Sequence, residues 1–165
     1  MEDRFETRTV SVKGIRTTYV EAGGGHGVPM ILIHGGGAGA SGLSNYRKNI
    51  GPLSKLGRVI VPDLPGWGES ENSIAPGSIY EALCQFMIDF MNALGIEKAN
   101  FVGNSLGGGI TLKVAVHHPQ RANKLVLMGP GGALHSYLRR PFSSPPGFRR
   151  SFCPCPIQGR RAGSG

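Results

Sequence analysis

ANFVGNSLG, residues 99–107, is the stretch of the sequence that decides the fold. The apolar residues at its start predict a buried strand, and the five residues Gly103-Asn104-Ser105-Leu106-Gly107 match the pattern Gly-x-Ser-x-Gly. This pattern is typical of a sharp strand-to-helix turn that lifts a serine hydroxyl above a parallel sheet. A serine hydroxyl is a weak nucleophile at neutral pH, whereas the amides of the helix that follows can stabilise an oxyanion. We therefore predict Ser105 as a catalytic nucleophile and Leu106 as one oxyanion donor.

The segments around this turn alternate between strand and helix patterns. Continuous apolar runs at 29–33 and 58–61 are typical of strands buried on both faces, as in parallel sheets. Residues 78–94 have apolar side chains at helical spacing, and Ser78 with Glu81 predicts a capping box. The alternation predicts an α/β fold, with a mostly parallel, doubly wound sheet and helices on both faces. The expected strands are 8–12, 17–21, 29–33, 58–61, 100–103 and 124–128, and the expected helices are 45–56, 78–94 and 106–117.

A second glycine motif follows the expected strand 29–33. His34 is followed by Gly35, Gly36 and Gly37. Glycine amides can approach a carbonyl oxygen closely, and removing one such donor costs about 3 kcal/mol of transition-state stabilisation. We predict that Gly36 and Gly37 complete an oxyanion hole with Leu106 and that His34 braces the loop. A flexible glycine loop without a catalytic role is the alternative.

The groups that would activate the serine are missing from their usual places. Sites of this type carry an acid and then a histidine after the serine, yet no Asp or Glu follows Glu97. His117 and His118 lie at the far end of the helix that Ser105 opens, about 18 Å away at 1.5 Å per residue. Asp63 is expected to brace its own turn rather than to face the site. The sequence thus predicts a nucleophile without its activating acid, with little or no turnover by this chain alone.

The net charge of +8 is concentrated at the C-terminal end. Residues 139–165 contain six arginines, five prolines and no acidic residue. We therefore expect residues 1–138 to form the N-terminal part of one domain and 139–165 to be a disordered basic tail, whose composition is typical of a gene read out of frame. The tail lacks a nucleic-acid-binding signature, so no nucleic-acid partner is expected. A non-enzymatic interaction protein that uses this tail as a contact is the alternative.

The remaining composition points to a cytoplasmic protein. Three cysteines are too few for a disulfide framework, and the N-terminus lacks the apolar core of a secretion signal. No uncharged run reaches the roughly 20 apolar residues of a membrane span. No cysteine or histidine cluster has the spacing of a metal site, and the glycine loops lack the Lys-Ser or Lys-Thr of a phosphate-binding loop. We expect no metal and no membrane association.

Three motifs together make the chain resemble an α/β-hydrolase over about residues 5–133. They are 34–37, 63–70 and 103–108. Longer strings resemble the meta-cleavage-product hydrolases, bacterial enzymes that cut a carbon–carbon bond in 2-hydroxy-6-oxo-dienoates formed by ring opening of aromatic compounds. These strings are 34–40, 44–46 and 128–132.

This resemblance implies a serine-type hydrolase that needs no cofactor and takes a small-molecule dienoate. Ser105 would be the nucleophile, and the amides of Gly36 and Leu106 would bind the oxyanion. Asn45 and Asn104 would contact the polar end of the dienoate. Another α/β-hydrolase, such as an esterase, is the alternative enzyme.

The resemblance also implies an incomplete α/β-hydrolase fold. The family places a helical lid after the sixth strand, a catalytic Asp after the seventh and a His after the eighth. This chain continues instead into its arginine-rich tail, so we expect a truncated hydrolase without the lid and the last two strands. Residues 124–128 would then form an exposed sheet edge that invites aggregation.

Overall fold

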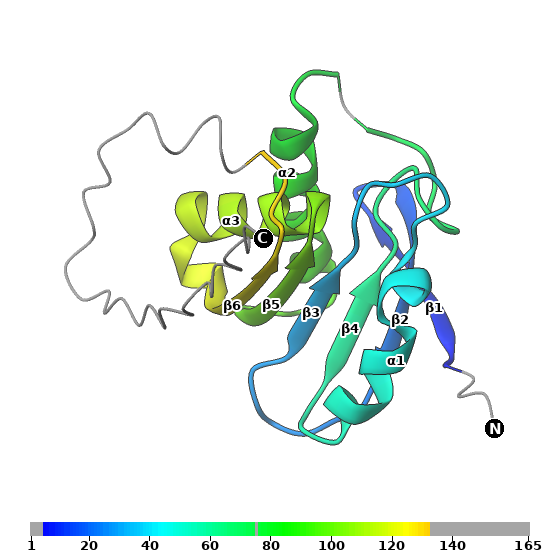
Figure 1. The fold of residues 1–165 in the computed structure, drawn as a ribbon, viewed down its shortest axis with the longest axis vertical. Coiled ribbons are helices and arrows are strands. Elements are labelled where there is room, and N and C mark those ends of the chain that lie inside the picture. Colours follow the sequence, from blue (N-terminus) through cyan, green and yellow to red (C-terminus); the bar gives the residue numbers. More distant parts are fainter. Residues whose placement is uncertain (1–4, 75, 133–165) are drawn as a thin grey trace, which may run out of the picture.

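The computed structural model describes residues 5–74 and 76–132, which form one mixed sheet with helices on both faces (Figure 1). The strand order is β1-β2-β4-β3-β5-β6. β1 and β2 are antiparallel, β2 is antiparallel to β4, and β3 to β6 run parallel. The predicted fold class is confirmed. The strands are β1 (Thr7–Val12), β2 (Ile15–Ala22), β3 (Met30–Ile33), β4 (Val59–Pro62), β5 (Ala99–Asn104) and β6 (Ala122–Met128).

The hairpin that opens the domain turns through two residues. Lys13 and Gly14 both have positive φ, 48° and 89°. A two-residue turn with positive φ at both positions matches the twist of the flanking strands, because its own twist has the same hand. Val12 and Ile15 therefore pair directly across the turn.

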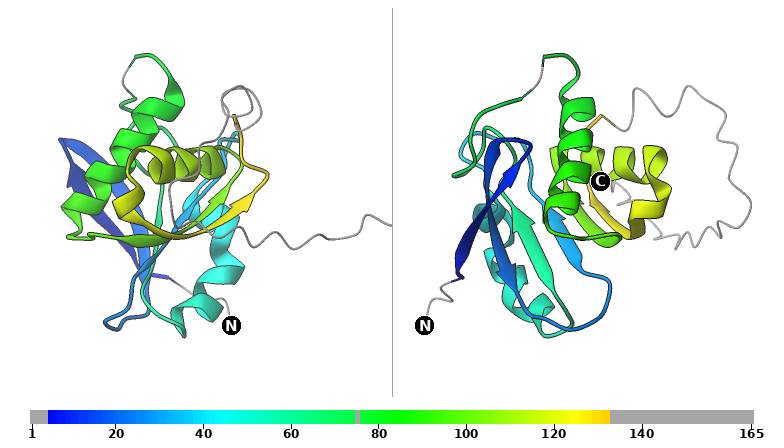
Figure 2. Two further views of the ribbon diagram at one scale, coloured as in Figure 1. Left: turned by 90° about the vertical axis from the view of Figure 1, so that its left-hand side faces the viewer. Right: turned by 180° about the vertical axis from the view of Figure 1, so that it is seen from behind.

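Helices cover both faces of the sheet. α1 (Gly42–Ser54) lies on one face, and α2 (Ile79–Ala93) and α3 (Leu106–His117) lie on the other (Figure 2). The strands serve both layers, because successive side chains point to opposite faces. Ile31 and Ile33 belong to the main cluster under α2 and α3, whereas Leu32 belongs to a smaller cluster under α1.

Two helix starts differ from the sequence-based expectation. α1 begins three residues before 45, because Ser41 and Ser44 form a reciprocal capping box with N–H to hydroxyl distances of 3.0 and 2.8 Å. The capping box predicted for Ser78 and Glu81 is wrong. Ser78 is the N-cap of α2 but makes no side-chain cap bond, and the Glu81 carboxylate pairs with Lys113 of α3 instead. The Glu81 side chain that a capping box would use is therefore engaged in an ion pair between α2 and α3.

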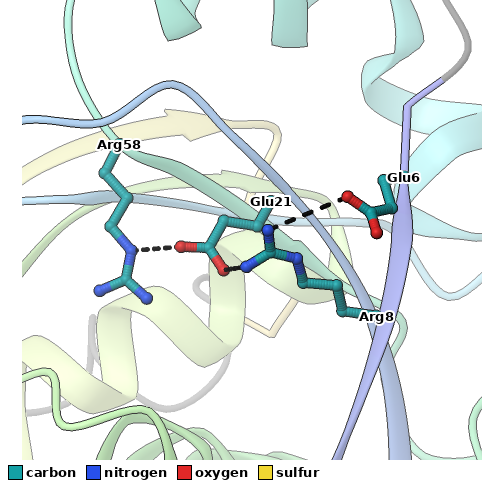
Figure 3. Close-up of polar contacts among 4 residues, drawn as sticks. All are labelled: Glu6, Arg8, Glu21 and Arg58. Atoms are coloured by element: carbon teal, nitrogen blue, oxygen red, sulfur yellow. Dashed lines mark hydrogen bonds and ion pairs between the residues drawn. The ribbon is translucent and has the colours of Figure 1, made fainter.

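A carboxylate ties the N-terminal hairpin to the parallel part of the sheet (Figure 3). Glu21 at the end of β2 accepts hydrogen bonds from Arg58 Nε at 2.6 Å and from an Arg8 terminal nitrogen at 2.7 Å. The Glu21 side chain is 14% exposed, so the solvent screens these pairs only partly. Glu6 approaches Arg8 at 4.0 Å from a largely exposed position.

β6 is the outermost strand of the described sheet, as predicted for 124–128. Val126 pairs with Val102 of β5, whose side chain packs against the cluster under α1. α1 does not extend over β6, so Val126 and Met128 remain 54% and 41% exposed. Within the described residues, no helix is both long and apolar enough to cross a membrane.

Candidate active site

The candidate site lies where the order of the parallel strands reverses. The chain passes from β3 to β4 on one side and then crosses back to β5 on the other side of β3. Loops that leave such neighbouring strands at their carboxyl ends diverge and leave a crevice, which is where open α/β sheets bind ligands. Ile33 is paired with Gly103, so the loop after β3 and the turn after β5 begin side by side.

Ser105 occupies the predicted strand-to-helix turn. Its backbone has φ 49° and ψ −110°, a conformation that costs a non-glycine residue on the order of 1–3 kcal/mol. The turn requires glycine at both glycine positions of the motif, because a side chain at either position would collide with neighbouring backbone. A Cβ on Gly103 would lie 2.5 Å from the carbonyl oxygen of Gly107, and one on Gly107 would overlap the carbonyl of Ile33. Ser105 itself is exposed at the end of the sheet.

The glycine loop after β3 lies against this turn. The Cβ position of Gly35 is 3.5 Å from Ser105 Cβ, and that of Gly36 is 2.8 Å from Leu106 Cδ2. The Gly35 amide donates to Asn45 Oδ1 at 3.1 Å, so Gly35 is not a free oxyanion donor. Gly36 therefore lies beside Leu106, as its predicted role requires. Gly37 lies further out, with no atom within 4 Å of its Cβ position.

The two asparagines suggested by the family resemblance lie together beside the serine. Asn104 Nδ2 donates to Asn45 Oδ1 at 2.9 Å, and the same oxygen accepts the Gly35 amide. Asn45 thus connects the first turns of α1 to the glycine loop and to the residue before Ser105. No sequence motif predicts this shared hydrogen bond, because its three partners come from separate segments.

Another contact that local motifs could not predict holds α1 against β3. The Tyr46 hydroxyl donates to the Ile33 carbonyl oxygen at 2.9 Å. Tyr46 is 3% exposed, and this burial raises the pKa of its hydroxyl to about 12. The phenol therefore stays protonated and can keep donating at neutral pH. It fixes the end of β3 directly before the glycine loop.

His34 braces the loop, as predicted, and its ring is committed on both nitrogens. The Leu64 amide donates to Nε2 at 3.0 Å, so Nδ1 carries the proton and donates to the Gly35 carbonyl at 2.7 Å. The ring is fully buried, and this burial lowers the pKa of His34 below its usual value. A neutral imidazole with both nitrogens bonded cannot serve as the base for Ser105.

Asp63 also has the structural role that was predicted for it. Its Oδ1 accepts the Gly42 amide at 2.7 Å, and its Oδ2 accepts the Glu69 amide at 3.0 Å. The first of these amides belongs to the first turn of α1, where a negative charge is favourable. The carboxylate is 8% exposed and thereby joins its own turn to the start of a helix.

The other described histidines lie away from Ser105. His26 is in the loop before β3, at the end of the parallel strands opposite to Ser105. His117 ends α3 and His118 is its C-cap, so both lie at the far end of the helix from Ser105. His135 and the predicted boundary at 138 lie outside the described residues. Within 5–74 and 76–132, no three His, Cys, Asp or Glu side chains are grouped so that they could hold a metal ion. Burial raises the pKa of the Cys84 thiol to about 11, which keeps it protonated.

Fold and site define the class of protein to which this chain belongs. A family model described as the alpha/beta hydrolase fold matches residues 28–152. The chain belongs to the α/β-hydrolase fold family.

More specific similarity is found to hydrolases of aromatic-compound degradation. The chain is 43% identical over 126 residues to a 2-hydroxy-6-oxononadienedioate/2-hydroxy-6-oxononatrienedioate hydrolase of Comamonas testosteroni, covering 75% of this chain and 44% of the relative. It is 42% identical over 126 residues to a 2-hydroxy-6-oxo-6-phenylhexa-2,4-dienoate hydrolase of Burkholderia cepacia, with the same shares covered. The chain thus spans less than half the length of these relatives.

Solved structures agree with this similarity. A meta-cleavage product hydrolase from Pseudomonas fluorescens superposes with a TM-score of 0.70 and 38% identity, covering 74% of this chain and 44% of that one. A serine hydrolase involved in carbazole degradation superposes with a TM-score of 0.73 and 38% identity, covering 81% of this chain and 51% of that one. The predicted resemblance to meta-cleavage-product hydrolases is confirmed.

Proposed function

We propose that this chain carries the nucleophile and the oxyanion hole of a hydrolase that cleaves carbon–carbon bonds in 2-hydroxy-6-oxo-dienoates. The observation that carries this proposal is the close approach of three separate segments. The exposed Ser105, the glycine loop at Gly36 and the Asn45–Asn104 pair all lie at the carboxyl ends of β3 and β5. The relatives to which this chain is 43% and 42% identical are named for such dienoates.

Each group has a defined role in this proposal. The amides of Gly36 and Leu106, with Gly37 as a further candidate, stabilise negative charge on the oxygen of the carbonyl that is attacked. Asn45 and Asn104 orient the polar end of the dienoate. The Ser105 hydroxyl adds to the 6-oxo carbon of the ketone tautomer, the bond between that carbon and its dienoate neighbour breaks, and a 2-hydroxydienoate leaves with the serine proton. Water then hydrolyses the acyl-serine, which releases a carboxylic acid and restores the hydroxyl.

Activation of Ser105 requires groups from outside the described residues. His34 and Asp63 are the buried imidazole and carboxylate near the ends of β3 and β4, and both are fully used by backbone partners. We therefore propose that residues 1–165 alone form the binding half of the site and turn over little or no substrate. A general base typically contributes 10²–10⁴-fold to such reactions.

The test is a chimera in which residues 1–132 are joined to the remaining C-terminal part of the Burkholderia cepacia relative. We expect the chimera to consume a 2-hydroxy-6-oxo-6-phenyl-dienoate, which is measured as the loss of the dienoate absorbance. The matched Ser105→Ala chimera should be at least about 10³-fold slower. The 165-residue chain is assayed beside them and should show no sustained loss of absorbance.

Two outcomes would contradict the proposal. A chimera that hydrolyses aryl esters but leaves the dienoate intact would assign the site to an esterase. Equal dienoate turnover by the Ser105 chimera and its alanine variant would remove Ser105 from the reaction.

A further inference from the structure

The backbone of Ser105 is held on both sides by the last residue of β6 and the loop that follows it. The Ser105 amide donates to the Met128 carbonyl at 2.8 Å, and the Gly131 amide donates to the Ser105 carbonyl at 2.7 Å. The Ser105 carbonyl also accepts the Gly109 amide at 3.1 Å within α3. A segment more than twenty residues away in the sequence thus bonds both polar backbone groups of the strained serine.

Two glycines of α3 allow this segment to lie so close. A Cβ on Gly108 would be 2.8 Å from Pro130 Cα, and a Cβ on Gly109 would overlap the carbonyl oxygen of Gly131. Glycine is the poorest helix former apart from proline, so consecutive glycines in a first helical turn call for a packing reason. The close approach of residues 128–132 supplies that reason.

Tyr80 packs against the loop residues Gly131 and Gly132. It lies in the first turn of α2, and its ring packs against a surface made of glycine backbones. A Cβ on Gly109 would be 2.5 Å from Tyr80 Cε1, one on Gly131 would be 2.7 Å from its hydroxyl oxygen, and one on Gly132 would be 3.0 Å from Cζ. The ring is only partly buried and joins the main apolar cluster from its edge.

We propose that Met128–Gly132, which we call the clamp loop, holds Ser105 in its strained conformation and that Tyr80 is the positioning residue that keeps this loop in place. Without the clamp, the positive φ of Ser105 would be free to relax toward the helical values of the residues that follow. The direction of the hydroxyl would then change, because the side chain turns with its backbone. The catalytic consequence rests on the proposed function, whereas the structural consequence does not.

The first test reads the serine directly in the 165-residue chain. The carbon chemical shifts of Ser105 report its φ and ψ, and amide hydrogen exchange reports the bonds of Ser105 and Gly131. In Tyr80→Ala we expect the Ser105 shifts to move toward ordinary helical values. Exchange of the two amides should quicken at least tenfold relative to amides of β3. Tyr80→Phe, which keeps the ring, should restore both signals.

Glycine substitutions supply a matched pair of variants. Gly109→Ala places a methyl group against Gly131 and Tyr80, whereas Gly57→Ala meets no atom within 4 Å and has no positive φ. The first should change the Ser105 shifts as Tyr80→Ala does, and the second should leave them unchanged. If Tyr80→Ala does not fold, Tyr80→Leu keeps the apolar bulk and takes its place.

The proposal is overturned if the Ser105 shifts stay constant in Tyr80→Ala and Gly109→Ala. It is overturned equally if exchange quickens by the same factor throughout the sheet, since Tyr80 would then be a stability residue. In the active chimera, Tyr80→Ala should lower kcat by at least tenfold with KM changed less than twofold. A chimera without dienoate activity would refute the proposed function, and the shifts and exchange rates would still decide the clamp.

Discussion

Replacing the Asp63 carboxylate by an amide should destabilise the domain more than the small change in shape suggests. Oδ1 and Oδ2 each accept one backbone N–H, from Gly42 and Glu69. In Asp63→Asn one of these oxygens becomes an NH₂ group. In either orientation of the amide side chain, this NH₂ group faces a backbone N–H and neither donor has an acceptor. A hydrogen bond to a charged group contributes about 1.5–3 kcal/mol, and an unpaired buried donor costs a similar amount. We expect the free energy of unfolding to fall by about 2–4 kcal/mol.

Urea unfolding of the 165-residue chain, followed by circular dichroism, measures this loss. Asp89→Asn is the matched control, because Asp89 pairs at 3.1 Å with Lys13, whose side chain is 71% exposed. An ion pair to an exposed partner is worth about 0–1 kcal/mol, so this control should lose less than about 1 kcal/mol. The reasoning is refuted if the two variants unfold at the same urea concentration with equal slopes.

Three further perturbations test other parts of the structure. Glu21→Gln should lower the free energy of unfolding by about 1–2 kcal/mol, because Arg8 and Arg58 lose their shared carboxylate. The control Glu6→Gln should change the free energy of unfolding by less than about 0.5 kcal/mol, and equal losses in the two variants would contradict this. Val126→Lys on the β6 edge should reduce the concentration-dependent association of the chain measured by light scattering. The control Leu56→Lys, which changes a 79% exposed side chain away from this edge, should not. Burial lowers the pKa of His34, so as the pH falls the unfolded chain takes up a proton on this residue before the folded chain does. The free energy of unfolding should therefore decrease as the pH drops below about 6.5. Protonation of the His34 imidazole in the folded chain at about pH 6, seen by NMR, would refute this.

Features set by neighbouring residues could be predicted from the sequence. The turn at Ser105 was predictable because its glycines lie within two residues of it and the required backbone is local. The roles of His34 and Asp63 were also predictable, since a buried polar residue at a strand end usually braces the loop that follows it. The parallel order of β3 to β6 followed from alternating apolar runs and helices.

Features set by distant partners could not be predicted in the same way. The capping box at Ser78 failed because Lys113, on another helix, offered the Glu81 carboxylate a partner of opposite charge. The triple glycine after Leu106 was visible in the sequence, but its contacts were not: Gly107 lies against the end of β3, and the next two glycines lie against the clamp loop and Tyr80. Sequence spacing describes what a segment can form alone, and these contacts depend on what the sheet brings next to it.

In the proposed function, the described residues position the nucleophile separately from the groups that activate it. Ser105 is contacted from three directions, by the glycine loop at Gly35, by the first turn of α3, and by the clamp loop at the end of β6. All three belong to residues 5–132, so the strained turn is complete without any further element. Activation is a different requirement, because it needs a titratable base within hydrogen-bond reach of the hydroxyl. The two requirements therefore separate experimentally: the Ser105 chemical shifts of the 165-residue chain should equal those of the chimera, while turnover should appear in the chimera alone.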